Sequence, residues 1–296
     1  MARTLEAESP ARSRAETGVQ RRGAFSPGKL LLYGLLILIA LFFILPLVWM
    51  LSTSLKVESE VFRDRGLFPA NPSLKNFETL VNSSGQTPVF RWMFNSVGVA
   101  VIGTALTLLL TSLSAYAFAR IDFRFKNVLF SLLITTLLLP GIMFLVPQYL
   151  LMSELKLLNT WPAFMLPGLA SVFGVFFMRQ FFLGIPVELE EAAYVDGAGR
   201  FRTFFSVILP LAGPALATLA VITFIGYWND YLWPLVTCQG GGCTLSPGLR
   251  NFQGTYSTQF GLLMAGAVLA AVPVLILYVF AQRYIVQSVT SSGIKG

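Results

Sequence analysis

Residues 191–210 read EAAYVDGAGRFRTFFSVILP, which is the most polar stretch in the second half of the chain. Long apolar runs flank it, over residues 161–182 and 213–236. Runs of that length are typical of bilayer-crossing helices, which need about 20 apolar residues. The stretch is therefore predicted to be a loop between two spans of an integral membrane protein.

The composition also indicates a membrane protein. Of the 296 residues, 55% are hydrophobic and 12% are charged, whereas an ordinary soluble domain carries about 25% charged residues. The chain contains no histidine, which excludes catalytic dyads with a histidine base and histidine-ligated metal sites. The net charge of +7 does not form a stripe along a folded surface, so we expect no nucleic-acid partner.

Six segments are apolar and long enough to cross a bilayer as helices. The predicted fold class is thus an all-α integral membrane protein with six transmembrane helices. The first run is too long for a signal peptide and no small-residue cleavage site follows it, so it is interpreted as a retained anchor. The segments are 30–52, 94–118, 128–152, 161–182, 213–236 and 260–282.

The basic residues predict the orientation, because Lys and Arg collect on the cytoplasmic side of a membrane. Two thirds of the 21 Lys and Arg residues fall on the side that holds both termini. Tryptophan, which prefers the interface, lies near the opposite ends of the spans, at Trp49, Trp92, Trp161, Trp228 and Trp233. Both termini and the loop with residues 191–210 are therefore expected in the cytoplasm.

This loop is predicted to begin with a short helix. Pro186 suits a first helical position, where its missing N–H is no loss. Glutamates at 188, 190 and 191 follow, where the helix dipole favours negative charge. Asp196 and Gly197 are expected to end the helix, because glycine adopts the left-handed conformation without strain.

A second helical piece is expected after this turn. Phe201, Phe204, Phe205 and Ile208 follow helical spacing, and the piece closes at Leu209-Pro210. The result is an elbow between two spans, with carboxylates at its rim. On physical grounds alone it is equally a docking site or a surface helix with a solvated acidic face.

The stretch resembles the EAA signature of the membrane subunits of binding-protein-dependent ABC importers, which forms a coupling helix that docks in a cleft of the ATPase. Val207 stands where that pattern has isoleucine. The ATPase-coupling residues that the resemblance implies are Glu190, Glu191, Ala192, Ala193, Asp196, Gly197, Ala198, Leu209 and Pro210.

The resemblance extends over about residues 94–296. The strings AYAFAR (115–120), LLNTW (157–161), WNDYLWPL (228–235) and GIKG (293–296) are similar to carbohydrate permeases of the maltose type, in particular to the G-subunit branch. The EAA pattern is specific for the importer class, whereas the other strings indicate the sugar branch less firmly.

This resemblance implies the transmembrane domain of a type I ABC importer, in the cytoplasmic membrane of a bacterium or archaeon. It implies a second homologous permease, two ATPase subunits, an extracytoplasmic solute-binding protein and a sugar substrate as partners. The chain itself is expected to bind no cofactor and to be no enzyme, since ATP and Mg would be held by the ATPase subunits.

The expected organisation follows from the spans and the resemblance. It comprises a disordered basic tail (1–29), a first transmembrane helix (30–52), an external loop (53–93), a permease core (94–284) with a cytoplasmic coupling loop (184–212) and an external loop (237–259), and a cytoplasmic tail (285–296).

A candidate translocation-path site lies near the outer end of the fifth predicted span. An ionisable side chain at membrane depth is a candidate functional group, and amides, carboxylates and aromatic faces bind sugars. Aromatic residues at a span end are also typical of an interfacial belt. The residues are Tyr227, Trp228, Asn229 and Asp230.

Two further sequence features say little about function. GAFSPGKL (23–30) approaches a P-loop, but Leu30 replaces the magnesium-binding Ser or Thr and a span follows directly, so we interpret it as a chance match. Cys238 and Cys243 flank QGGG, and their spacing fits a disulfide or two free thiols.

Alternative functions remain at this stage. The same importer fold is compatible with a solute other than a sugar. An ion-coupled secondary transporter would need ion-coordinating groups at mid-membrane and usually internal repeats, whereas only Asp230 is available, near a span end. A membrane-embedded enzyme would need a nucleophile with a base, or a metal site, and the sequence lacks these parts.

Overall fold

The computed structural model describes residues 27–64, 66–82, 87–238, 243–254 and 258–292, with side chains up to residue 282. The described residues are helical, with one isolated bridge between Gln253 and Thr258 as their only β pairing. The basic tail predicted to be disordered lies almost wholly outside the described residues.

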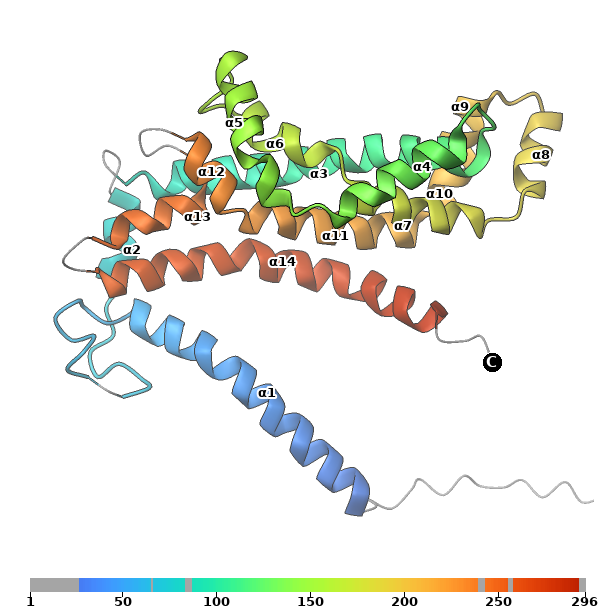
Figure 1. The fold of residues 1–296 in the computed structure, drawn as a ribbon. Helices are drawn as coiled ribbons and strands as arrows, with labels where there is room; N and C mark the ends of the chain where they lie inside the picture. The colour runs from blue at the N-terminus through green and yellow to red at the C-terminus, as the bar shows by residue number, and fades with distance from the viewer. Residues whose placement is uncertain (1–26, 65, 83–86, 239–242, 255–257, 293–296) are drawn as a thin grey trace, which may run out of the picture. The chain divides into compact units, whose positions relative to one another are not determined.

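The helices follow one another along the chain, with a long connection over residues 55–74 between the first two (Figure 1). They are α1 Pro27–Ser54, α2 Lys75–Asn82, α3 Val89–Arg120, α4 Lys126–Thr135, η1 Thr136–Leu138, η2 Gly141–Phe144, α5 Leu145–Glu154, α6 Trp161–Leu169, α7 Val172–Leu183, α8 Glu188–Val195, α9 Arg200–Thr203, η3 Phe204–Ile208, α10 Leu209–Leu211, α11 Gly213–Asn229, α12 Leu232–Thr237, α13 Leu245–Gly248, η4 Leu249–Phe252 and α14 Phe260–Ser292.

The chain divides into two units, residues 1–47 and 48–296. Within the first unit, α1 is a continuous apolar helix from Pro27 onward. At about 1.5 Å per residue, its full 28 residues reach about 42 Å, which exceeds the roughly 30 Å of a bilayer core.

Among the described residues, α1, α3 and α14 are each long and apolar enough to cross a membrane as single helices. Three pairs of helices pass the same test only when each pair counts as one bent span. The bends are 97° between residues 126–138 and 141–154, 49° between 161–169 and 172–183, and 79° between 200–211 and 213–229. By length and composition, the described residues thus contain three candidate spans, or up to six if each bent pair is one span.

Two of the three bends fall where backbone hydrogen bonding is interrupted. Pro140 lies between η1 and η2 with an extended backbone, and a proline N–H is not available to continue a helix. At the second bend, the Ser171 hydroxyl accepts the Gly174 N–H at 3.1 Å and begins α7 anew. Broken helices of this kind occur in membranes where protein or a cavity surrounds the freed carbonyls.

Helix α3 lies at the centre of the second unit and packs against α6, α7 and α11. One face of α3 carries a small buried residue every four positions: Gly103, Thr107, Thr111, Ala115 and Ala119. Small residues on one face allow helix backbones to approach closely. The core of the unit therefore forms around this face.

The two ends of the second unit are built differently (Figure 1). Helices α8 to α10 lie at one end, and α2, α12 and α13 at the other. At the latter end, both carboxylate oxygens of Glu58 accept backbone N–H groups at the start of α14, from Phe260 at 3.0 Å and Gly261 at 2.8 Å. The Asn76 amide donates to the carbonyls of Ser54 and Lys56, both at 2.8 Å. The segment 53–93, predicted to be an external loop, is thus fixed to the last long helix through Glu58.

The disulfide alternative for the two cysteines is the one that the structure contains. Cys238 and Cys243 are bonded, with Cα atoms 5.8 Å apart. The residues between them lie outside the described part of the chain.

Candidate functional site

The stretch that opened the sequence analysis forms an elbow between α7 and α11 (Figure 1). It contains α8, a turn at Gly197, and the continuous run of α9, η3 and α10. The helix, the turn and the second helical piece lie where the sequence pattern predicts them.

Helix α8 ends in a glycine-dependent turn. Gly197 has a φ of +80°, the left-handed conformation. Its N–H donates to the Tyr194 carbonyl at 3.0 Å, and the Ala198 N–H donates to the Ala193 carbonyl at 2.9 Å. These two bonds form a Schellman motif, which satisfies the last carbonyls of the helix. No heavy atom lies near the position of an added Cβ at Gly197, so its backbone conformation is what requires glycine.

The second helical piece contains a π-helical turn, η3. Pro210 has no N–H to donate to the preceding turn, and the Leu209 N–H donates to the Phe204 carbonyl, five residues back. Phe204 and Ile208 are buried, whereas Phe201 is 75% exposed. Of the four apolar residues at helical spacing, only Phe204 and Ile208 are therefore in the core, since Phe205 is 47% exposed.

Glu190 is buried, which corrects the expectation that the carboxylates lie at the rim of the elbow. Its side chain is 5% exposed, and one oxygen lies 2.7 Å from Nε of Arg120. The other oxygen accepts the Tyr116 hydroxyl at 2.9 Å. A buried charge needs such partners, because desolvation without them is costly.

Arg120 joins three segments of the chain. It ends α3, pairs with Glu190 of α8, and donates from Nη2 to the carbonyl of Phe182 at 2.7 Å and to that of Ile185. These carbonyls lie at the end of α7, where a helix leaves acceptors unsatisfied. We call Tyr116, Arg120 and Glu190 the buried link. Sequence reasoning missed the role of Tyr116 and Arg120, although both belong to the quoted string AYAFAR.

The other predicted coupling residues lie at or near the surface of the elbow. Glu191, Ala192, Asp196, Gly197 and Pro210 are exposed, and Ala193, Ala198 and Leu209 are partly buried. Apolar side chains of α8 share this surface: Val195 is 87% exposed, and Leu189 and Tyr194 are each 42% exposed. Exposed apolar side chains rimmed by carboxylates are typical of a protein interaction site.

The four candidate translocation-path residues do not all line the same cavity. Trp228 is buried, donates its indole N–H to the Ala270 carbonyl at 3.2 Å, and stacks on Phe224. Asn229 is exposed and does not line a described cavity with the others. Trp228 thus packs against α14, in the core of the unit.

Tyr227 and Asp230 line a common cavity of about 380 Å³. The Tyr227 hydroxyl donates to the Met165 carbonyl at 3.1 Å and lies 3.1 Å from the Thr107 hydroxyl. An Asp230 oxygen accepts the Trp233 N–H at 3.3 Å. Gln148 and Trp233 also line this cavity. Neither was a sequence candidate for this site: Trp233 was named only as an interfacial tryptophan and within the string WNDYLWPL, and Gln148 lies on α5, about 80 residues earlier in the chain.

Long and bent apolar helices with a polar elbow between two of them indicate a multi-pass membrane protein. The chain matches the family model of the binding-protein-dependent transport system inner membrane component over residues 107–291. It belongs to this family.

Curated relatives match along most of the chain. It is 36% identical to the arabinooligosaccharides transport system permease protein AraQ of Halalkalibacterium halodurans, over 87% of this chain and 93% of that protein. It is 33% identical to the lactose transport system permease protein LacG of Rhizobium radiobacter, over 88% of this chain and 94% of that protein.

A solved structure has the same fold. A chain of a bacterial ABC transporter involved in the import of alginate superimposes with a TM-score of 0.78 at 23% identity. The match covers 88% of this chain and 99% of that chain.

Proposed function

We propose that this chain is one of two permease subunits of an ATP-driven carbohydrate importer. The oligosaccharide-transporting relatives support a sugar as the solute. In this proposal six spans run with both termini in the cytoplasm. A second homologous permease completes the pathway, two ATPase subunits hold ATP and Mg, and a solute-binding protein delivers the sugar outside.

The observation that carries the proposal is the buried link behind the exposed face of α8. Arg120 and Tyr116 belong to the central helix α3, and Glu190 belongs to α8. A force on the exposed face would reach α3 through a short ion pair between well-buried groups. ATPase closure therefore moves the elbow and α3 together, and the spans rock between inward-facing and outward-facing states.

The proposed sugar path uses the cavity with Tyr227 and Asp230, together with Gln148 and Trp233. Carboxylate, amide and indole groups are suited to hydroxyl groups and to the C–H faces of a sugar ring. Trp228 and Asn229 are not part of this path in our proposal, because Trp228 packs against α14.

Two substitutions of Gly197 test the lever role. Asparagine tolerates the left-handed conformation and a β-branched valine does not; an ordinary residue loses about 1–2 kcal/mol there. We expect Gly197→Asn to import a panel of labelled oligosaccharides near the wild-type rate. Gly197→Val should insert in the membrane and lose most uptake. Wild-type uptake by Gly197→Val would refute the lever role.

A further inference from the structure

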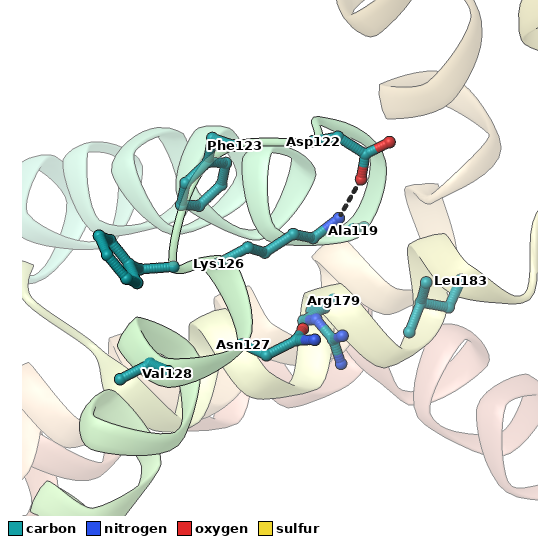
Figure 2. A pocket seen from close by; sticks show the side chains of 9 residues that line it. Ala119, Asp122, Phe123, Lys126, Asn127, Val128, Arg179 and Leu183 are labelled. Carbon is teal, nitrogen blue, oxygen red and sulfur yellow. Dashed lines mark hydrogen bonds and ion pairs between the residues drawn. The ribbon is translucent and has the colours of Figure 1, made fainter.

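A hollow of about 430 Å³ lies beside the buried link, where α3 ends, α4 begins and α7 ends (Figure 2). Its polar lining consists of the basic side chains of Lys126 and Arg179, the amide of Asn127 and the carboxylate of Asp122. The proposed function leaves this hollow unused.

Arg179 is held in one orientation and keeps its charge uncompensated. Its Nε donates to the Phe118 carbonyl at 3.1 Å, and its guanidinium carbon lies 4.2 Å from the centre of the Phe130 ring. Within the described part of the chain, no carboxylate lies within ion-pair distance of Arg179. A cation over an aromatic face is attracted to it but remains a full positive charge.

Lys126 adds a second positive charge to the hollow. Its ammonium group lies 3.5 Å from a carboxylate oxygen of Asp122, whose side chain is fully exposed to solvent. Exposed pairs of this kind are weak, so Asp122 neutralises the hollow poorly. Figure 2 shows Lys126 extended toward Asp122, and Arg179 on the α7 side.

The rim of the hollow is apolar. Phe125 is 60% exposed, Val128 is 56% exposed and Leu183 is 44% exposed. A hollow with two cations inside and apolar side chains at its rim complements a molecule that carries an anionic group on an apolar body. Arg and Lys both bind phosphoryl oxygens strongly.

We propose that this hollow, the headgroup site, binds the phosphoryl group of an anionic phospholipid. Clusters of basic residues at the cytoplasmic end of spans attract such lipids, at short range because salt screens the interaction. The exposed apolar rim favours a lipid over free inorganic phosphate. The assignment to the cytoplasmic leaflet rests on the proposed orientation, whereas the site itself does not.

The test uses the full chain, purified with its accompanying subunits. It is reconstituted in phosphatidylcholine vesicles with phosphatidylglycerol, a trace of which carries a photoactivatable acyl chain. We expect crosslinks to the α3–α4 connection and the end of α7, and retained phosphatidylglycerol in native mass spectra. Lys126→Gln should weaken this binding about fivefold, through loss of one basic group near the anion.

Arg124→Gln is the matched control. Arg124 lies on the same connection and is exposed; its guanidinium carbon lies 4.8 Å from the centre of the Phe125 ring at the rim, but Arg124 does not line the hollow. Its removal should therefore weaken the binding less than Lys126→Gln does. Arg179→Gln should weaken the binding too, and Lys126→Gln decides the matter if that variant fails to fold. An equal loss in the Arg124 and Lys126 variants would overturn the site. Displacement of the lipid by inorganic phosphate at equal concentration would overturn the lipid assignment.

Discussion

Removing the Glu190 carboxylate tests the buried link, and the neighbouring Glu191 provides a matched control. The Glu190 side chain is 5% exposed and that of Arg120 is 10% exposed. Glu190→Ala leaves the Arg120 cation buried without its anion, and breaking a buried pair in this way costs about 3–5 kcal/mol. Glu191→Ala changes an exposed residue, and such changes stay within about 0.5 kcal/mol.

A double-mutant cycle separates the ion pair from the other contacts of each residue. Arg120→Ala also leaves the Phe182 and Ile185 carbonyls without a donor, and each buried unsatisfied group costs about 1–3 kcal/mol. Arg120→Ala should therefore be the more destabilising single change. The double variant should be more stable than the sum of the two singles predicts, with a coupling energy of about 3 kcal/mol.

The assay is reversible unfolding of the purified chain in mixed micelles, followed as the fraction of denaturing detergent rises. Each of the four proteins of the cycle is measured, with Glu191→Ala alongside. A coupling energy below about 0.5 kcal/mol, the limit for independent sites, would refute the buried link. So would equal destabilisation by Glu190→Ala and Glu191→Ala.

Three other predictions concern the second unit. Gly98→Ala should destabilise the chain by about 1–3 kcal/mol in the same unfolding assay, because its Cβ would overlap the Trp161 ring. Gly226→Ala should be neutral or stabilising, because open space surrounds the added carbon. If Gly226→Ala were more destabilising than Gly98→Ala, the packing of α3 against Trp161 would be contradicted. Glu58→Gln should speed hydrogen exchange at the first two N–H groups of α14, because both donate hydrogen bonds to the Glu58 carboxylate. Unchanged exchange would contradict the role of Glu58 in capping the start of α14. The backbone N–H groups of residues 66 and 70 lower the pKa of Asp64 below its usual range. These hydrogen bonds are therefore present at neutral pH and are lost as the pH falls through the lowered pKa of Asp64. Hydrogen exchange over residues 55–74, corrected for intrinsic rates, should rise in that pH range in the wild type. It should not rise in Asp64→Asn, which has no carboxylate to protonate.

The family and the helices could be predicted from sequence, because both depend on local patterns. The stretch 191–210 identified the family that the comparisons show. Gly197 predicted its own positive φ, since the residues that end a helix are neighbours in the chain. The apolar runs likewise predicted where the long apolar segments are helical, but not that three of these segments are each broken into two helices at angles of 49° to 97°.

The orientation of single side chains could not be predicted in the same way. Glu190 and Glu191 are adjacent on an eight-residue helix, and nothing local distinguishes the buried one. Glu190 is the buried one because it pairs with Arg120, which lies 70 positions earlier in the chain. Tyr227 and Trp228 present the same problem: a step of one residue turns a helix by about 100°, and the neighbouring helices determine which of the two faces the cavity.

The most direct test of the central claim is to isolate the chain from its native membrane in mild detergent and identify what accompanies it. Glu191→Lys reverses a charge on the exposed face of α8 and leaves the buried link intact. We expect an ATPase and a second permease to accompany the wild type, and the ATPase alone to be lost from the variant. Wild-type chain that comes without an ATPase, or an ATPase retained equally by the variant, would contradict that claim.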